Sequence, residues 1–509
     1  MENSGISSKS ESERKIMKIL LVSTPAPAVR QTAIEKEYWK WHYALKTKLT
    51  YPNFSEKELT KLGNSENQNV GLLSIANVLK KKGHKVFYLA PKPENAPLQK
   101  REKLFGRKLL EIIKKEMPHI VCFSAHTCAI PTAMSYAESA KSTNPKIITI
   151  IGGPHASGVN GKDLGELLSA FDFVVKGKGE LPIAMLADAL EKRCSTDYIP
   201  GICYRKGNKI IAKEPAMVGF SDYPRPANGL LNVKTLPAAR VFTSLGCRRN
   251  GSCVFCADTI HNKGFTERPV GEAIDEIKYL HRKFRTKYVY FGDENFFFDK
   301  ERAINAIDKI NKLNLDIVVG YQVRLESADE GIIKKIAESR KCTEIQYGVE
   351  SASQEILNLN RKGLRYENVK KICKLTKKHG INVHCYFLVG LPGETKETAE
   401  STINEMCSLL ESGLVDFVEY RIAVPFPGAP MYDNAKEFGV KILKKNWKLY
   451  RGENLPQYEL NNLSRHEIYN SYQKGLRRVA EIYKEIYIKE FGKRLPKINV
   501  LSAVTEGGF

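Results

Sequence analysis

The sequence predicts an α/β protein with two main domains, an N-terminal doubly wound parallel sheet and a partial (β/α) barrel, followed by a helical C-terminal segment. Apolar strand-like runs alternate with amphipathic helical runs twice along the chain, over 15–190 and again over 238–430, which is typical of parallel sheets covered by helices. A stretch that contains several Pro and Gly residues separates the two series. At 509 residues the chain is also too long for one ordinary hydrophobic core.

The composition is that of a soluble globular protein, with 42% hydrophobic and 27% charged residues. No run approaches the roughly 18 apolar residues of a membrane-spanning helix. The polar start carries no apolar signal-peptide core, so we expect a cytoplasmic protein with reduced cysteines. The formal charge of +23 is compatible with an anionic partner. Because no RNA-binding motif with interleaved aromatic residues accompanies it, the charge does not identify nucleic acid as a partner.

The first domain is expected over 15–190, after a disordered lead of 1–14. A buried strand over 15–23 precedes an insert at about 25–68 that is rich in aromatic side chains. The cluster in this insert fits either a lid over an active site or local packing, and consists of Tyr38, Trp39, Trp41, His42 and Tyr43.

Strands and helices then alternate with little interruption. The expected helices are 71–82, 104–116, 131–142 and 164–171, and the expected strands are 85–89, 119–124, 146–151 and 173–175. Ligands of a doubly wound sheet bind at the carboxyl ends of its strands. Two of the strands end in turns at Gly152–Gly153 and at Gly177–Gly179, where the missing side chains let a large ligand approach the backbone.

The alternation stops over 191–237, which we interpret as a linker. Within it, a turn at 206–209 between two short apolar runs predicts a small hairpin. Pro224, Pro226 and Gly229 then mark the domain boundary.

A cluster of three cysteines directly follows the first strand of the second series. Cys247, Cys253 and Cys256 have the spacing Cys-x5-Cys-x2-Cys. Thiolates select iron–sulfur clusters, zinc or Cu(I), and a cluster usually takes four such ligands, so three ligands suggest a cluster with one iron open to a substrate or cofactor. A zinc site completed by His261 and a loop without metal are the alternatives.

The second domain is expected over 238–430 as a partial barrel of six βα units. The expected strands are 239–245, 287–291, 316–323, 344–349, 382–389 and 416–423, and the expected helices are 270–284, 300–313, 329–338, 367–379 and 396–411. Active-site residues of such barrels lie at the carboxyl ends of the strands, and the cysteine loop occupies that position after the first strand. Residues 431–509 are expected to be helical, over 438–449 and 466–490.

The first domain resembles the cobalamin-binding, Rossmann-like domain that precedes some radical S-adenosylmethionine (SAM) enzymes. The resemblance rests on four segments: the helix from Asn69-Val-Gly71 to Gly83-His84, the Ser124-Ala-His-Thr turn, Ile-Ile-Gly152-Gly153-Pro154-His155-Ala, and Val-Val-Lys-Gly177-Lys-Gly-Glu180. It implies cobalamin contacts at Ser124, Gly152, Gly153, Pro154, His155 and Gly177. Domains that place a histidine on cobalt use an Asp-x-His-x-x-Gly stretch, which the region after Lys85 lacks, so we expect no histidine ligand from this domain.

The second domain resembles the TIM-type partial barrel of radical SAM enzymes. Phe291-Gly292-Asp293-Glu294 resembles the Gly-Gly-Glu motif that holds the SAM ammonium, with Asp293 in place of the second glycine. Arg324 ends the third strand, where a guanidinium can bind the SAM carboxylate. Glu350-Ser351 resembles the ribose-contacting pair, and the segments at Gly390 and at 424–430 resemble the adenine and rim segments.

The cysteine loop departs from the family spacing Cys-x3-Cys-x2-Cys by two extra residues in its first interval. Phe255 matches the aromatic residue that precedes the last cysteine, and the insert 248–252 contains Gly251. An insert of this kind can bulge outward, so we expect all three cysteines to bind the metal cluster.

The resemblance implies a [4Fe–4S] cluster whose fourth iron is chelated by SAM, reductive cleavage to a 5′-deoxyadenosyl radical, and methyl transfer from methylcobalamin to a substrate carbon. It therefore implies a C-methyltransferase acting on an unactivated carbon, with an external electron donor of flavodoxin or ferredoxin type. The protein positions these groups, and the groups carry the chemistry. The sequence names neither a small-molecule nor a peptide substrate.

Three other functions compete with this interpretation. A related enzyme would catalyse ring rearrangement, cyclisation or oxidation without methyl transfer. RNA methylthiolation fits the positive charge, but Cys122, Cys128 and Cys194 do not resemble the second cluster-binding set of that family. A zinc-stabilised binding module leaves the motifs at the strand ends unexplained.

Overall fold

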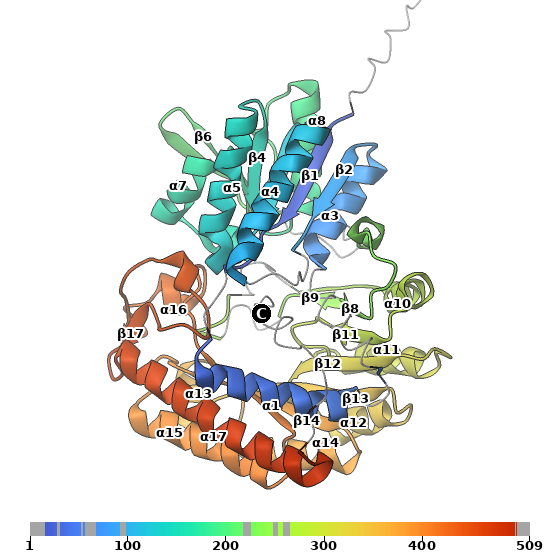
Figure 1. Cartoon of the computed structure of the whole chain (residues 1–509), viewed down its shortest axis with the longest axis vertical. Helices are drawn as coiled ribbons and strands as arrows, with labels where there is room; N and C mark the ends of the chain where they lie inside the picture. Colours follow the sequence, from blue (N-terminus) through green and yellow to red (C-terminus); the bar gives the residue numbers. More distant parts are fainter. Residues whose placement is uncertain are drawn as a thin grey trace, which may run out of the picture.

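The computed structural model describes residues 16–27, 31–51, 54–55, 68–91, 98–216, 225–247, 253–257, 265–493 and 495. It contains two α/β domains and a C-terminal segment that contacts both (Figure 1). The expected lead over 1–14 and the start of the first strand at Lys15 lie outside the described residues. In that described part, no helix is long and apolar enough to cross a membrane.

The N-terminal domain is built on one seven-stranded sheet, counted over the described residues, with the order β2-β1-β3-β4-β5-β6-β7. The first five strands are parallel, and β6 and β7 add antiparallel at the edge. Their bounds are β1 Lys18–Ser23, β2 Lys85–Leu89, β3 Ile120–Ser124, β4 Ile148–Gly152, β5 Phe173–Val175, β6 Ile202–Lys206 and β7 Lys209–Ala212. The hairpin that we placed in the linker is therefore the edge of this sheet.

Helices cover both faces of the sheet, as expected for a doubly wound fold. They are α3 Val70–Lys81, α4 Leu98–Glu116, α5 Ile130–Thr143, α6 Pro154–Gly158, α7 Gly161–Ala170 and α8 Glu180–Lys192, with the short 3-10 turn η2 Thr127–Ala129. Each face of the sheet packs into its own cluster of buried side chains. The strands are therefore apolar on both faces.

The second domain is the predicted partial barrel, whose six described strands are all parallel in the order β15-β14-β13-β12-β11-β8. They are β8 Ala238–Val241, β11 Tyr288–Phe291, β12 Val318–Arg324, β13 Cys342–Glu350, β14 Asn382–Val389 and β15 Phe417–Ile422. The outer helices are α10 Val270–Phe284, α11 Lys300–Asn311, α12 Glu330–Ala337, α13 Gln354–Leu359, α14 Asn368–Lys378 and α15 Lys396–Glu411, with the turn η5 Leu325–Ser327.

The N-terminal insert contributes helix α1 (Ala33–Thr50), which packs against the barrel and the last helix, α17 (Arg465–Phe491), instead of against its own domain (Figure 1). Thr32 caps its start in a capping box with Glu35. The Tyr38 hydroxyl donates to the Val418 carbonyl at 2.5 Å, and Lys46 lies 3.2 Å from Glu344. The aromatic cluster of the insert therefore has the packing role.

The C-terminal segment differs from the predicted helix over 438–449. That stretch forms a short antiparallel pair, β16 (Val440–Ile442) with β17 (Tyr458–Leu460), and then the turn η6 (Trp447–Leu449). Gly439 has a φ of +64°, a left-handed conformation that ends any helix before it. A four-residue helix, α16 (Pro430–Asp433), precedes the pair, and α17 confirms the helix expected over 466–490.

The carboxyl edges of the two sheets face each other. Gly158 ends α6, which follows strand β4, and a Cβ atom there would lie 1.9 Å from the carbonyl oxygen of Pro427, which follows strand β15. Asp163 of α7 also accepts a hydrogen bond from Tyr432 at 2.8 Å and pairs with Lys445 at 2.6 Å. Both ligand-binding edges therefore open toward the same interdomain region.

Candidate active site

The cysteine loop leaves the barrel after β9 (Ser244–Leu245) and returns through β10 (Thr266–Glu267), which pairs antiparallel with β9. Cys253 is buried, and Cys247 and Cys256 are half-buried. The strand predicted over 239–245 is thus interrupted between β8 and β9. The two-residue insertion within 248–252 and the alternative ligand His261 lie outside the described residues.

The second part of the loop is held from two sides at Val254. Its N–H donates to the Asn360 carbonyl at 3.1 Å, and its own carbonyl accepts from Met431 N–H at 2.9 Å. The neighbouring Cys253 sulfur lies 3.8 Å from the Arg361 carbonyl oxygen. These contacts fix Cys253 and Cys256 against the end of the barrel.

The donor set bears on the choice between a single ion and a cluster. Cys247, Cys253 and Cys256 supply three thiols from one loop. A structural zinc site is usually closed by four protein ligands, whereas three thiolates leave one iron of a four-iron cluster open. A separate group in the N-terminal domain, His84, Asp188 and Glu191, has ligand atoms within 4.8 Å of one another.

Asp293 holds the backbone that leads into the cysteine loop. It is fully buried, and its carboxylate accepts hydrogen bonds from Thr243 N–H at 3.1 Å, Thr243 Oγ1 at 2.7 Å and Ser244 Oγ at 2.5 Å. Burial raises the pKa of Asp293, against these hydrogen bonds and the charge of Arg302. This acid, which replaces the expected glycine, thus fixes the corner between β8 and β9.

The residues on either side of Asp293 also contact the cysteine segment. Glu294 accepts a hydrogen bond from the N–H of Gly246 at 3.1 Å, one residue before Cys247. A Cβ atom on Gly292 would lie 2.7 Å from the Phe242 ring, so a larger residue does not fit there.

Arg324 lies beside a predicted cluster ligand. Its Nη1 is 3.6 Å from the Cys253 sulfur, its Nε donates to Glu326 at 2.5 Å, and its Nη2 donates to the carbonyl of Lys362. Burial lowers the pKa of Arg324, but the charges of Glu326 and Cys253 outweigh burial and raise it. The guanidinium is therefore charged at every physiological pH.

Glu350 is part of a buried ion pair with Lys362, with 2.7 Å between Oε1 and Nζ. Glu350 has a left-handed φ of +74°, which is uncommon for a residue other than glycine. A Cβ atom on Gly348 would lie 2.6 Å from the Glu350 carboxylate, so glycine leaves room for the pair. Ser351 is fully buried and lies 3.3 Å from Thr402 Oγ1.

The turn at Gly390 is bound to residues behind the barrel end. Its N–H donates to Glu394 at 2.5 Å, and its carbonyl accepts from the Tyr458 hydroxyl at 2.7 Å. Burial raises the pKa of Glu394 to about 8, although the N–H groups of Gly390 and Leu391 lower it. Gly390 itself has a φ of +83°.

The structure thus brings one part of the predicted site together and leaves another part apart. Glu294 and Arg324 each contact the cysteine segment, and Lys362 links Arg324 to Glu350. Ser351 and Gly390 have their hydrogen bonds with other residues of the barrel.

The barrel lumen beneath this site is polar. The hydroxyl of Tyr290 lies 2.6 Å from Gln322 Oε1 and 3.1 Å from Gln346 Oε1, and the hydroxyl of Tyr386 donates to Gln346 at 2.8 Å. Tyr347 points to the opposite face, where its hydroxyl lies 2.9 Å from Thr376 of α14. The hydroxyls of Tyr386 and Tyr347 therefore lie on opposite faces of the barrel sheet.

On the N-terminal domain, the predicted cobalamin residues gather at the carboxyl edge of the sheet. Ser124 pairs in register with Gly152. Gly153 has a φ of +97°, and a Cβ there would lie 3.0 Å from Ser124 Oγ. Pro154 begins α6. This edge carries backbone and small side chains, which a large planar ligand needs.

His155 and Gly177 are also at this edge. His155 is buried, its Nδ1 is 3.2 Å from Thr127 Oγ1, and its ring packs edge-on against Trp447 with centroids 4.8 Å apart. Burial lowers the pKa of His155 to about 3. Gly177 has a φ of +73°, and its N–H donates to Ser157 at 3.0 Å.

Three residues of this region were missed at the level of sequence. Asn69 donates from Nδ2 to both Ser23 Oγ and Ser124 Oγ at 3.3 Å. Lys362 pairs with Glu350, and the side chain of His126 is exposed two residues beyond the end of β3. The sequence signal for His126 was its place in the Ser124-Ala-His-Thr turn.

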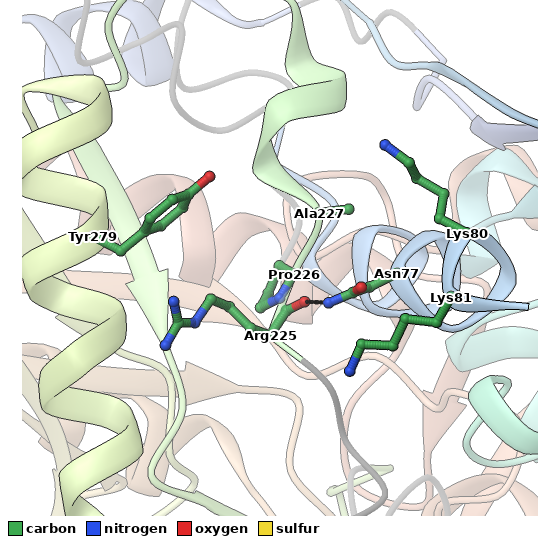
Figure 2. A pocket seen from close by; sticks show the side chains of 7 residues that line it. All are labelled: Asn77, Lys80, Lys81, Arg225, Pro226, Ala227 and Tyr279. Carbon is green, nitrogen blue, oxygen red and sulfur yellow. Dashed lines mark hydrogen bonds between the residues drawn. The ribbon is translucent and has the colours of Figure 1, made fainter. Parts of the chain in front are cut away.

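A cavity of about 460 Å³ lies at the domain junction, between α3, residues 225–227 and α10 (Figure 2). Lys80 and Lys81 project from α3, and the Asn77 amide donates to the Arg225 carbonyl at 2.6 Å. The Arg225 guanidinium lies 5.5 Å from the centre of the Tyr279 ring. None of the predicted site residues lines this cavity, so it is separate from the facing sheet edges.

Two family models match the two domains. The B12 binding domain matches residues 63–193, and the radical SAM superfamily matches residues 241–406. An uncharacterised methyltransferase of Pyrococcus horikoshii is 31% identical over 357 residues, which cover 69% of this chain and 76% of that protein. The chain belongs to the cobalamin-dependent radical SAM enzymes.

Other relatives differ in their named reactions. An anaerobic magnesium-protoporphyrin IX monomethyl ester cyclase of Rubrivivax gelatinosus is 25% identical, over 64% of this chain and 59% of that enzyme. A cytidylyl-2-hydroxyethylphosphonate methyltransferase of Streptomyces wedmorensis is 23% identical, over 66% of this chain and 71% of that enzyme.

Solved structures share the fold. The radical SAM methyltransferase TsrM from Kitasatospora setae aligns with a TM-score of 0.62 at 16% identity, over 84% of this chain and 77% of that one. The cobalamin-dependent radical enzyme OxsB aligns with a TM-score of 0.65 at 16% identity, over 90% of this chain and 66% of that one. The predicted fold class is confirmed, and this radical SAM enzyme uses a [4Fe–4S] cluster, SAM and cobalamin.

Proposed function

We propose that this enzyme is a C-methyltransferase that acts on an unactivated carbon of its substrate. The observation that carries the proposal is the apposition of the two sheet edges, seen in the contact between Gly158 after β4 and Pro427 after β15. It turns the cobalamin edge of one domain toward the cysteine loop of the other. A methyl donor and a radical source can then reach one substrate from opposite sides.

The residues of the chain would act by holding and orienting the cofactors. We assign the cluster to Cys247, Cys253 and Cys256, because thiolates are its usual ligands and two of the three are fixed by the contacts of Val254. When bound, the cluster and SAM supply a radical that takes a hydrogen atom from carbon, and methylcobalamin supplies the methyl group.

For SAM, we assign the ammonium to the segment Gly292, Asp293 and Glu294, and the carboxylate to Arg324. Glu294 contacts the backbone before Cys247, and Arg324 contacts Cys253, so both lie where a molecule bound to the open iron would reach. Asp293 would act as a positioning residue, since its carboxylate is used by Thr243 and Ser244.

For the ribose and adenine of SAM, we assign Glu350, Ser351 and Gly390 at the ends of the next strands. Glu350 carries a carboxylate that can accept hydrogen bonds from ribose hydroxyls, and Lys362 forms an ion pair with it. For cobalamin, we assign Ser124, Gly152, Gly153, Pro154, His155 and Gly177, which all lie at one sheet edge.

Cyclisation without methyl transfer is the second candidate, because cyclases are among the relatives. Methylthiolation has a relative as well, a putative methylthiotransferase of Methanocaldococcus jannaschii at 25% identity. Of the cysteines that a second cluster would need, Cys122 and Cys128 are buried, and burial raises the pKa of Cys122 to about 12. Those thiols suit a protein core better than a cluster.

The test is an anaerobic reaction of the reconstituted enzyme with SAM carrying a deuterated methyl group, a flavodoxin or ferredoxin as electron donor, and a metabolite extract. Methyl transfer predicts S-adenosylhomocysteine, 5′-deoxyadenosine and a product with the labelled methyl group by mass spectrometry. Formation of 5′-deoxyadenosine without a labelled product would favour cyclisation or oxidation. The Cys253→Ala variant is the control, and it should form no 5′-deoxyadenosine.

A further inference from the structure

The crevice for a ligand on the N-terminal sheet lies between β1 and β3. These strands are neighbours, yet the chain continues from β1 to β2 on one side and from β3 to β4 on the other. Such a switch point opens a crevice at the carboxyl ends of the two strands. Asn69 lies at this crevice, where its amide donates hydrogen bonds to Ser23 at the end of β1 and to Ser124 at the end of β3.

His126 stands at this crevice, two residues beyond β3. Its side chain is exposed to water, yet burial is the main cause that lowers its pKa, followed by the charges of Arg240 and Arg451. Arg240 belongs to β8 of the barrel and Arg451 to the C-terminal segment, so His126 faces the barrel and the C-terminal segment across the domain junction.

The backbone at His126 is held in place by neighbouring contacts. His126 precedes the turn η2, and its carbonyl accepts from Ala129 N–H at 2.9 Å. Thr127 of that turn is buried and lies 3.2 Å from His155, whose ring packs on Trp447. His155 is thus a positioning residue for the loop that carries His126.

The ring nitrogens of His126 have no hydrogen-bond partner among the described residues, although the neighbouring histidine has one. A neutral imidazole ring offers a nitrogen lone pair that binds transition metals. The chain offers this ring from the loop after β3. A histidine ligand from this loop would depart from the expectation that the domain supplies none, which was drawn from the missing Asp-x-His-x-x-Gly stretch after Lys85.

We propose that His126 binds the cobalt of cobalamin through an imidazole nitrogen, on the corrin face that lies against the N-terminal sheet. This rests on the proposed placement of cobalamin at that edge. Gly152 and Gly153 would leave room beside the ring for the corrin, and Arg240 would lie on the barrel side. The ligand would come from a different loop than in domains that use Asp-x-His-x-x-Gly.

Electron paramagnetic resonance of the reduced Co(II) form tests the proposal without an activity assay. The protein is labelled uniformly with nitrogen-15 and loaded with unlabelled hydroxocobalamin. A bound histidine splits the cobalt lines into doublets in labelled protein and triplets in unlabelled protein. Triplets that persist after labelling would show the nitrogen base of cobalamin itself on cobalt, and would overturn the proposal.

Two variants complete the test. His126→Gln should retain cobalt by metal analysis but lose the label-dependent doublets, and His126→Ala should do the same. His119→Asn is the matched control, because His119 lies at the opposite end of β3, where its Nδ1 accepts from Lys18 N–H, and it should keep the doublets. Retained doublets in both His126 variants would contradict the assignment.

The outcomes also separate this proposal from the proposed function. Cobalt bound without label-dependent splitting overturns the His126 ligand alone, and methyl transfer remains to be judged by its products. Wild-type protein that retains no cobalt overturns both the ligand and the methyl transfer from cobalamin. Formation of 5′-deoxyadenosine from SAM would then still show, independently of cobalamin, whether the barrel domain is active.

Discussion

The guanidinium of Arg324 contacts the sulfur of Cys253, with 3.6 Å between Nη1 and Sγ. The same guanidinium binds Glu326 and the carbonyl of Lys362, so it connects a cluster ligand to the end of β13. A fixed positive charge beside a thiolate favours the more negative, reduced state of a cluster.

Replacing Arg324 with Lys is therefore expected to keep the protein folded and the cluster potential nearly unchanged, while SAM binding weakens by about tenfold. Lysine keeps the charge but not the planar fork that binds a carboxylate with two hydrogen bonds. A redox titration of the cluster measures the first effect, and a SAM titration followed by the signal of the reduced cluster measures the second. An unchanged SAM titration in Arg324→Lys would contradict the assignment of the carboxylate to Arg324.

A second prediction concerns the contribution of the Glu350–Lys362 ion pair to stability. Lys362→Met should lower the free energy of unfolding by about 3–5 kcal/mol, because it leaves a buried carboxylate without its partner. Adding Glu350→Gln should restore part of that loss, since the buried charge is then removed as well. Thermal unfolding of the two single variants and the double variant gives the coupling. Additive losses would show that the pair is not coupled.

A third prediction is that the carboxyl group of Glu394 makes the stability of the folded protein depend on pH. Burial raises its folded pKa to about 8, so between its ordinary pKa and pH 8 the folded state binds the proton that the unfolded state releases. The contribution of this group to stability therefore falls with rising pH in that window, by up to about 1.4 kcal/mol per pH unit, and stays level above it. Glu394→Gln should remove this slope from melting temperatures of the apoprotein. An identical slope in wild type and variant would contradict the raised pKa.

A substitution at Gly158 tests whether the two domains pack closely against each other. Gly158→Ala places a methyl group against Pro427, where an ideal Cβ would be 1.9 Å from the carbonyl oxygen, and should cost about 1–3 kcal/mol by overpacking. Gly165→Ala in α7 is the matched control, because its Cβ would meet Ile210 at 3.6 Å. Small-angle scattering and melting temperatures measure the effect. Equal behaviour of the two variants would argue against tight docking.

Much of the fold was predictable because the spacing of apolar residues along the sequence follows directly from which side chains are buried. Helix α10 and strands β2, β5 and β14 begin and end where their patterns predict. The false helix over 438–449 failed because its apolar residues pair with β17, a partner that local pattern does not reveal. The break between β8 and β9 depends on Asp293, which is about 50 residues away in sequence.

The site was predictable only in part. Motifs mark which strand ends carry chemistry, and the cysteine loop, Glu294 and Arg324 do lie together. The pairing of Lys362 with Glu350 depends on a tertiary contact. The Ser124-Ala-His-Thr turn places His126 after β3, but its proximity to Arg240 and Arg451 depends on how the domains pack. Sequence spacing contains no signal for such contacts.

The most direct test of the proposed cofactor sites is anaerobic reconstitution with iron, sulfide and hydroxocobalamin, followed by metal analysis and a visible spectrum after desalting. We expect about four irons and one cobalt per chain, with iron lost and cobalt kept when Cys247, Cys253 and Cys256 are replaced together by Ala. Iron without cobalt would contradict methyl transfer from cobalamin. Protein that retains neither metal would contradict the assignment of the three cysteines and of the facing sheet edges.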